Sequence, residues 1–142
     1  MEFTIVATEA PTAADRDGIL APLIAYNDRL AGPSGFKLLA LLLRDQAGKT
    51  IGGLWARSVY DWMYVELLAV PDVLRRQGVG SDLMRCAEAA ARERGCVGLW
   101  VDTYGFQAPD FYVRLGFEMF GTLDDHPRGS GRYFFRKRLD AA

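Results

Sequence analysis

The sequence predicts an α/β (α+β) fold in which helices flank a mixed, mostly antiparallel sheet of about seven strands. Two observations carry this prediction. Short segments of alternating or continuous apolar residues fill most of the chain, and one central segment changes to a helical period. The 142 residues are 50% hydrophobic and 25% charged, which is typical of one compact domain with an ample core. We therefore expect residues 1–142 to form a single domain.

The first half of the chain contains strands and one early helix. Residues 3–8 alternate as a strand does, and Thr12 followed by Asp15 resembles a capping box that opens a helix. Pro22 is expected to split this helix. Further strands are predicted at residues 36–44, 50–60 and 63–70. A hairpin at residues 45–48 joins the first two of these, so the three form an antiparallel meander.

A change of period marks the central helix. Four apolar residues fall on one helical face: Leu83, Ala87, Ala90 and Ala91. Gly95 marks the C-terminal end of this helix. The rest of the chain alternates again, apart from a short helix at residues 109–115. The strands predicted there are residues 98–103, 118–123 and 132–139.

Charge and cysteine content exclude several classes of protein. A formal net charge of −1 provides no strong field for nucleic acid or an anionic membrane. Cys86, Cys96 and His126 lack the spacing of a zinc site, and we expect both cysteines to be buried, reduced thiols. The sequence contains no apolar run of about 18 residues and no signal-peptide pattern, so a cytoplasmic location is expected.

The most informative stretch is residues 67–81, where a predicted strand leads through a loop into a glycine-containing turn and a helix. Gly78 and Gly80 permit a tight turn that aims free backbone N–H groups and the positive end of the helix dipole at one point. Arg75 and Arg76 can add charge-assisted hydrogen bonds. The pattern fits a phosphate or pyrophosphate site, although such glycines also fit a plain helix start.

Two other phosphate motifs do not match this stretch. A Walker loop requires Lys and then Ser or Thr after its last glycine, whereas Ser81 follows Gly80 directly. A dinucleotide-binding fingerprint requires Gly or Ala where Leu83 stands. We therefore predict neither a Walker loop nor a dinucleotide-binding turn here.

Two blocks taken together are more specific than the glycines alone. The first, Arg75-x-x-Gly78-x-Gly80, has the form Arg/Gln-x-x-Gly-x-Gly/Ala. The second, residues 108–117, has the form Ala-x-x-Phe-Tyr-x-x-x-Gly-Phe. Both blocks and the order of elements resemble the GNAT N-acetyltransferase superfamily. The resemblance implies a sheet that is splayed between its fourth and fifth strands, here residues 63–70 and 98–103.

The resemblance implies acetyl-coenzyme A (acetyl-CoA) as co-substrate and no metal. Its pantetheine arm would pair with strand backbone between the splayed strands, and its pyrophosphate would contact amides of the glycine-containing turn. The cofactor-binding residues implied are Leu68, Ala69, Val70, Arg75, Arg76, Gln77, Gly78, Val79, Gly80, Ser81, Gln107 and Tyr112.

Tyr112 and Glu66 are the candidate catalytic residues. Tyr112 matches the family tyrosine that protonates the departing thiolate; on chemistry alone a packed aromatic would be the more common role, and the family match favours the proton donor. Glu66 is the charged residue of an apolar strand, where burial would favour its neutral form and suit a general base. A structural hydrogen bond or an exposed edge position is the alternative for Glu66.

The chain departs from the family pattern near the second block. Many relatives carry Asn three residues before its alanine, where this chain has Gly105. Gln107 can supply an amide contact to the cofactor instead, or it can belong to the turn.

The resemblance implies direct transfer of an acetyl group to a primary amine without a covalent enzyme intermediate. A small-molecule amine is the expected acceptor. A protein N-terminus or lysine is the alternative acceptor, and a non-catalytic acyl-CoA-binding module is the alternative function. No nucleic acid or membrane partner is expected, and a homodimer is compatible with the sequence.

Overall fold

A computed structural model describes residues 1–140 of the chain. By its internal contacts the chain divides into two compact units, residues 1–34 and the remainder from Gly35 onward. We call the second the sheet unit, because it contains every strand assigned within the described residues. The residues predicted for the cofactor and for catalysis all belong to the sheet unit.

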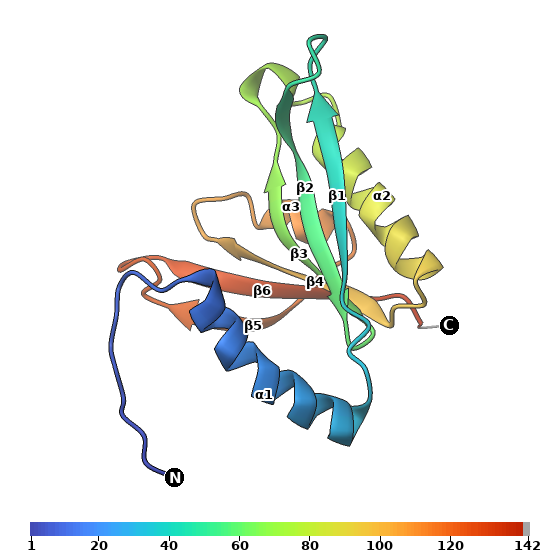
Figure 1. The fold of residues 1–142 in the computed structure, drawn as a ribbon. Helices are drawn as coiled ribbons and strands as arrows, with labels where there is room; N and C mark the ends of the chain where they lie inside the picture. The colour runs from blue at the N-terminus through green and yellow to red at the C-terminus, as the bar shows by residue number, and fades with distance from the viewer. Residues whose placement is uncertain (141–142) are drawn as a thin grey trace. The chain divides into compact units, whose positions relative to one another are not determined.

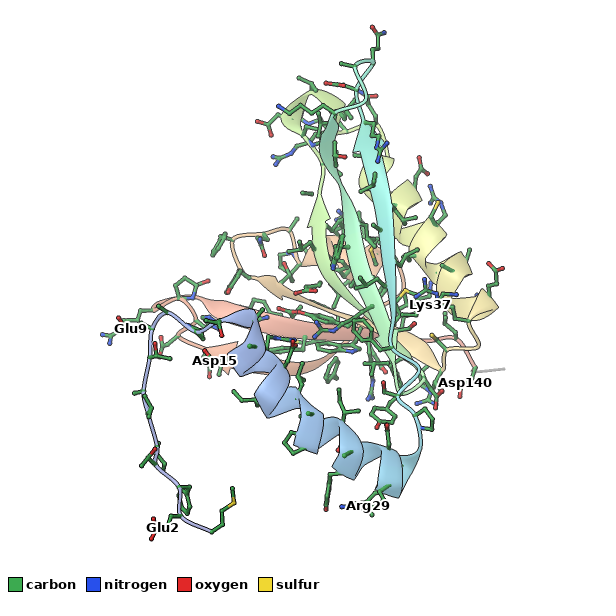
Figure 2. All side chains as sticks on the ribbon, in the orientation of Figure 1. Glu2, Glu9, Asp15, Arg29, Lys37 and Asp140 are labelled. Carbon is green, nitrogen blue, oxygen red and sulfur yellow. The ribbon has the colours of Figure 1, made fainter. Side chains whose placement is uncertain are left out.

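The first unit contains helix α1 (Ala13–Ala31), which begins at the predicted capping box. The Thr12 hydroxyl accepts a hydrogen bond from the Asp15 amide at 3.1 Å, and the Asp15 carboxylate accepts one from the Thr12 amide at 2.8 Å. Figure 2 labels Asp15 in the first turn and Arg29 in the last. The expected break at Pro22 is wrong, because α1 continues through that residue.

The sheet unit holds a six-stranded sheet of order β1-β2-β3-β4-β6-β5 (Figure 1). All neighbours pair antiparallel except β3 and β4, which are parallel, so the predicted mixed, mostly antiparallel sheet is confirmed. Within residues 1–140 the expected strand at residues 3–8 is not formed, because no neighbouring strand accepts its hydrogen bonds. The strands are β1 (Lys37–Arg44), β2 (Thr50–Val59), β3 (Trp62–Ala69), β4 (Gly98–Tyr104), β5 (Glu118–Asp124) and β6 (Gly131–Arg138).

Helix α2 (Val79–Glu93) forms the crossover that a parallel β3–β4 pair requires. A 3₁₀ turn, η1 (Asp72–Leu74), precedes it, and a short helix, α3 (Asp110–Arg114), follows β4. Figure 1 shows α2 running along one face of β1 and β2, and it also contacts β3 and β4. This confirms the predicted central helix.

The core lies between α2 and the sheet. The strands turn alternate side chains toward α2, so that Met63 and Val65 of β3 and Leu99 and Val101 of β4 are buried. The apolar face of α2 covers them with Leu83, Met84, Ala87 and Ala91. Cys96 is buried as expected, but Cys86 is exposed because it lies on the outer face of α2. Both thiols are free.

The β3–β4 ladder ends before either strand does. Its last pair is Val65↔Val101, although β3 continues to Ala69 and β4 continues to Tyr104. On its other side β3 stays paired with β2, with a register shift that leaves Glu66 as an extra residue between Val65 and Leu67. The two strands therefore separate beyond Val65 and Val101, as the predicted splay requires.

Candidate active site

The glycine-containing turn becomes the N-terminus of α2. Gly78 is the N-cap in a left-handed conformation with φ 76°, a backbone conformation that glycine adopts without steric cost. No side chain caps this end, and the first helical bond runs from the Asp82 amide to the Gly78 carbonyl at 3.0 Å. The amides of Val79, Gly80 and Ser81 precede that bond, so they have no acceptor in the helix and are available to an anion.

Gly80 brings the two sequence blocks together. A Cβ atom added at Gly80 would lie 3.4 Å from the Phe111 ring of α3 and 3.8 Å from Val70 Cγ2. A Cβ at Gly80 would thus be in ordinary van der Waals contact with α3, so α3 lies against the first turn of α2. Local motifs that are about 30 residues apart thus form one region of the surface.

Polar side chains of the loop before α2 bond to other residues of the same loop. Arg75 Nε lies 3.1 Å from Asp72 Oδ1 and 3.4 Å from the Val70 carbonyl oxygen. Gln77 Nε2 donates to the Val73 carbonyl at 3.2 Å. Arg76 has a positive φ of 63°, which turns the chain toward the Gly78 N-cap. Shaping the loop is therefore a visible role of Arg75 and Gln77.

Tyr112 lies on α3 with 8% of its surface exposed. Its ring contacts Phe117 of the same sequence block and Phe135 of β6, with centroids 6.0 Å and 5.9 Å away. Burial and the negative charge of Asp102 raise the pKa of Tyr112 to about 12. The phenol is therefore neutral at physiological pH and able to donate a proton. Within residues 1–140 no side chain or backbone group is hydrogen-bonded to its hydroxyl.

Glu66 occupies the extra position in β3, where the strand begins to separate from β4. The expectation that this carboxylate is buried is wrong: its side chain is 39% exposed. Alternation along β3 puts Glu66 on the face opposite the buried Met63 and Val65, and Arg57 Nη1 lies 3.7 Å from Glu66 Oε2. A carboxylate at the splay point remains present, but it is solvated and faces a cation.

Gln107 belongs to the turn after β4. Its side-chain oxygen accepts a hydrogen bond from the Tyr104 amide at 2.9 Å, and the Thr103 hydroxyl lies 3.3 Å away. Its backbone amide donates to the Tyr104 carbonyl at 2.9 Å. The turn role that the sequence left open is therefore present, and the side-chain NH₂ is the part left to contact a ligand.

The face of the sheet opposite α2 carries a polar cluster that contains none of the predicted site residues. Tyr64 Oη donates to Asp102 Oδ1 at 2.5 Å, and Arg132 Nε donates to Asp102 Oδ2 at 2.5 Å. The Asp102 side chain is 9% exposed. Alternation along β4 is the signal that could have placed Asp102 on this face, but its partners are 38 and 30 residues away in sequence.

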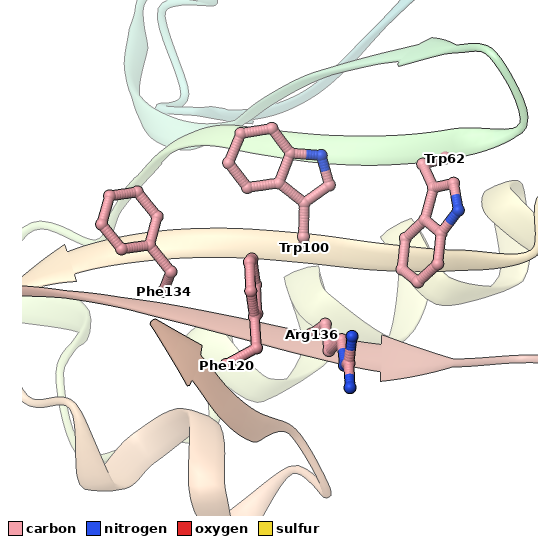
Figure 3. A pocket seen from close by; sticks show the side chains of 5 residues that line it. All are labelled: Trp62, Trp100, Phe120, Phe134 and Arg136. Atoms are coloured by element: carbon pink, nitrogen blue, oxygen red, sulfur yellow. The ribbon is translucent and has the colours of Figure 1, made fainter. Parts of the chain in front are cut away.

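Aromatic side chains on the same face line a pocket of about 380 Å³. Figure 3 shows the five residues that line it, which are Trp62, Trp100, Phe120, Phe134 and Arg136. The Trp100 ring also stacks on Tyr64 with centroids 3.9 Å apart, so the pocket and the polar cluster are adjacent. None of the predicted site residues lines this pocket.

Comparison with known proteins agrees with this geometry. Residues 7–117 match the model of the acetyltransferase (GNAT) family. The chain belongs to the GNAT family. An acetyltransferase of Agrobacterium fabrum is 35% identical over 137 residues, which cover 96% of this chain and all of that protein. The blasticidin-S acetyltransferase of Streptomyces morookaense is 40% identical over 95 residues, which cover 66% of this chain and 70% of that enzyme.

Solved structures show the same GNAT fold. A candidate acetyltransferase from Agrobacterium tumefaciens matches with a TM-score of 0.91 and 34% identity, covering 96% of this chain and 100% of that one. A Bacillus anthracis protein assigned as a streptothricin acetyltransferase, solved with acetyl-CoA, matches with a TM-score of 0.60 and 23% identity, covering 81% of this chain and 68% of that one. At that identity the second likeness concerns the fold alone.

GNAT membership confirms the predicted family, the acetyltransferase activity and acetyl-CoA as co-substrate. The uncapped α2 terminus fits the pyrophosphate, because it presents free amides where the chain leaves the splayed strand. Among residues 1–140, no group of three or more His, Cys, Asp or Glu side chains is placed to hold a metal ion. No helix in that range has both the length and the hydropathy needed to cross a membrane.

Proposed function

We propose that the protein is an N-acetyltransferase that moves an acetyl group from acetyl-CoA directly to a primary amine of a small molecule, with residues 1–142 acting as a single catalytic domain. One observation carries the proposal: β3 leaves its ladder with β4 at Val65 and leads within the same chain segment to the uncapped N-terminus of α2. An extended arm ending in a pyrophosphate matches this arrangement of strand backbone followed by free amides.

The chain's own residues bind and orient the co-substrate. Backbone groups of β3 beyond Glu66 have no partner on β4 and are suited to hydrogen-bond the pantetheine amides. The amides at the start of α2 are suited to the pyrophosphate. The binding residues proposed are Leu68, Ala69, Val70, Arg75, Arg76, Gln77, Gly78, Val79, Gly80, Ser81, Gln107 and Tyr112.

Acetyl-CoA supplies a thioester whose acetyl carbon accepts the amine nitrogen as the carbon–sulfur bond breaks. Tyr112 is positioned by α3 as a neutral phenol that gives its proton to the departing sulfur. Glu66 takes a proton from the amine nitrogen, directly or through water, because it is a solvated carboxylate at the splay point. A backbone N–H of β3 polarises the acetyl carbonyl.

The likeness to a blasticidin-S acetyltransferase supports a small-molecule acceptor, because that relative is named for acetylating an antibiotic and is 40% identical over 95 residues. The free thiols of Cys86 and Cys96 support a cytoplasmic location, where such thiols stay reduced. A homodimer is compatible with this function.

Calorimetric titration with acetyl-CoA followed by a thiol-release assay over a panel of amines tests the proposal. The panel contains aminonucleoside and aminoglycoside antibiotics, polyamines, amino acids and short peptides with free N-termini or lysines. We expect binding and thiol release with a small amine. Release only with peptides would assign a protein acetyltransferase, binding without release would assign an acyl-CoA-binding module, and absence of binding would refute the cofactor site.

A further inference from the structure

Three side chains join neighbouring strands beside the splay. Tyr64 of β3, Asp102 of β4 and Arg132 of β6 form what we call the polar clamp. Asp102 accepts from Tyr64 through Oδ1 and from Arg132 through Oδ2. The carboxylate is 9% exposed, and a charge buried to that extent requires such partners. The clamp therefore satisfies Asp102 and ties three strands together.

The position of the clamp is specific. Val65↔Val101 is the last backbone pair between β3 and β4, and Asp102 is the first β4 residue beyond it. Tyr64 lies one residue before the end of the ladder and is held by stacking on Trp100 at 3.9 Å. Its hydroxyl thus reaches forward across the point where backbone pairing stops. A side-chain link replaces the ladder at that point.

The clamp is linked to both candidate catalytic residues, to Glu66 through Arg57 and to Tyr112 through the charge of Asp102. The Arg57 guanidinium lies 5.3 Å from the centroid of the Tyr64 ring, and the same Arg57 lies 3.7 Å from Glu66. On the other side, the charge of Asp102 contributes to the raised pKa of Tyr112. Because both oxygens of Asp102 accept hydrogen bonds within the clamp, Asp102 is placed to organise the site rather than to exchange a proton with substrate.

We propose that the polar clamp of Tyr64, Asp102 and Arg132 sets the point at which β3 and β4 separate, and that its members are positioning residues for the acetyl-CoA cleft. The proposal rests on the proposed function for its catalytic consequence. Its structural consequence, a fixed separation of the two strands, stands independently of any activity.

Tyr64→Phe tests the proposal because it removes the hydroxyl and keeps the ring on Trp100. Tyr133→Phe is the matched control, since it removes a hydroxyl on the same strand as Arg132 but outside the clamp. Hydrogen exchange of the full unliganded chain is compared for the three proteins. We expect amides of β3 and β4 around residues 64–69 and 100–104 to exchange about tenfold faster in Tyr64→Phe, and to stay unchanged in Tyr133→Phe.

A second pair of variants covers the case in which Tyr64→Phe fails to fold. Arg132→Lys keeps a cation beside Asp102, whereas Arg132→Gln removes it. We expect acetyl-CoA to bind about threefold to tenfold more weakly in Arg132→Gln, with a smaller change in Arg132→Lys, and KM for acetyl-CoA to rise in parallel.

Two outcomes would overturn the proposal that the clamp sets the point of strand separation. One is equal exchange at β3 and β4 in Tyr64→Phe and Tyr133→Phe. The other is faster exchange throughout the sheet, including β1 and β2, which would indicate general destabilisation. Failure of the proposed function is distinguishable, because it appears as absent thiol release in the unsubstituted protein, while the exchange experiment still decides the clamp.

Discussion

Tyr112 has the properties that a proton donor to sulfur needs. Its ring is packed between Phe117 and Phe135, which limits its rotation, and its hydroxyl has no hydrogen-bond partner among the residues that the structure describes. Burial raises the pKa of the phenol, so the proton is present at neutral pH. A tyrosine that served packing alone would be replaceable by phenylalanine without loss of turnover.

Tyr112→Phe is therefore expected to lower kcat by about 10² to 10⁴ while acetyl-CoA still binds, because one proton-transfer group is removed from an unchanged cleft. Thiol-release kinetics and calorimetry measure the two quantities. Unchanged kcat would show that Tyr112 serves packing alone.

Glu66, the proposed base, is solvated and lies near Arg57, on the face of β3 opposite the buried Met63 and Val65. Glu66→Gln should lower kcat by about 10² or more, and raising the pH should restore part of the loss as more acceptor amine becomes deprotonated. Glu118→Gln is the control, since Glu118 is also an exposed carboxylate paired with an arginine, at 3.0 Å from Arg136. Equal rates for both variants would exclude Glu66 as the base.

At the scale of elements, the proposed acetyl-CoA site combines a strand that loses one neighbour with a helix whose N-terminus has no capping side chain. The β3–β4 ladder stops at Val65↔Val101, and the chain then reaches α2 through a loop held by Arg75 and Asp72. Neither element would bind a cofactor alone. Their succession presents backbone groups along one path, so we expect Gly78 to matter for acetyl-CoA binding as well as for turning the chain.

Gly78→Glu should abolish or weaken acetyl-CoA binding by at least about tenfold, because it places a carboxylate at the positive end of α2, the proposed site of the pyrophosphate. Gly48→Glu is a matched control: Gly48 has φ +83° beside +76° for Gly78, and neither position has an atom within 4 Å of an added Cβ. Both variants should lose about 1–2 kcal/mol of stability from backbone strain. Calorimetry measures binding and urea unfolding measures stability, and equal loss of binding in both variants would argue against a pyrophosphate site at the N-terminus of α2.

At the scale of the whole molecule, two phenols couple stability to pH: Tyr112 is buried and Tyr64 is half-buried. Burial raises the pKa of both Tyr112 and Tyr64 to about 12, in Tyr64 with help from its hydrogen bond to Asp102. Each folded-state pKa lies above the unfolded value, so the neutral phenol stabilises the fold fully below about pH 10. That contribution declines as the pH rises from about 10 to about 12.

The free energy of unfolding should therefore fall between about pH 10 and pH 12. The decline should be shallower in Tyr112→Phe and in Tyr64→Phe, because each lacks one of the titrating groups. Urea unfolding at a series of alkaline pH values measures this. If the free energy of unfolding falls with pH as steeply in the variants as in the unsubstituted protein, the raised pKa values of the two phenols are contradicted.

Much of the fold follows from local sequence. The capping box of Thr12 and Asp15, the amphipathic α2 and the hairpin at residues 45–48 all depend on residues within a few positions of one another, and all are present. The splay was expected from the family resemblance and is confirmed by the ladder. The helix break at Pro22 and the strand at residues 3–8 were wrong, because flanking hydrogen bonds and the presence of a partner strand decide such features.

The amino-acid sequence was sufficient for the family and for the glycine turn, because the two blocks that carry them are short, local patterns with a direct backbone meaning. Tertiary structure alone decided that Glu66 is solvated and faces Arg57, since these residues lie on different strands and the register of the pair brings them together. It alone also assembled Tyr64, Asp102 and Arg132, whose contacts join residues 38 and 30 positions apart. Alternation assigns a residue to a face of a sheet, but strand order and register determine which residues it meets there.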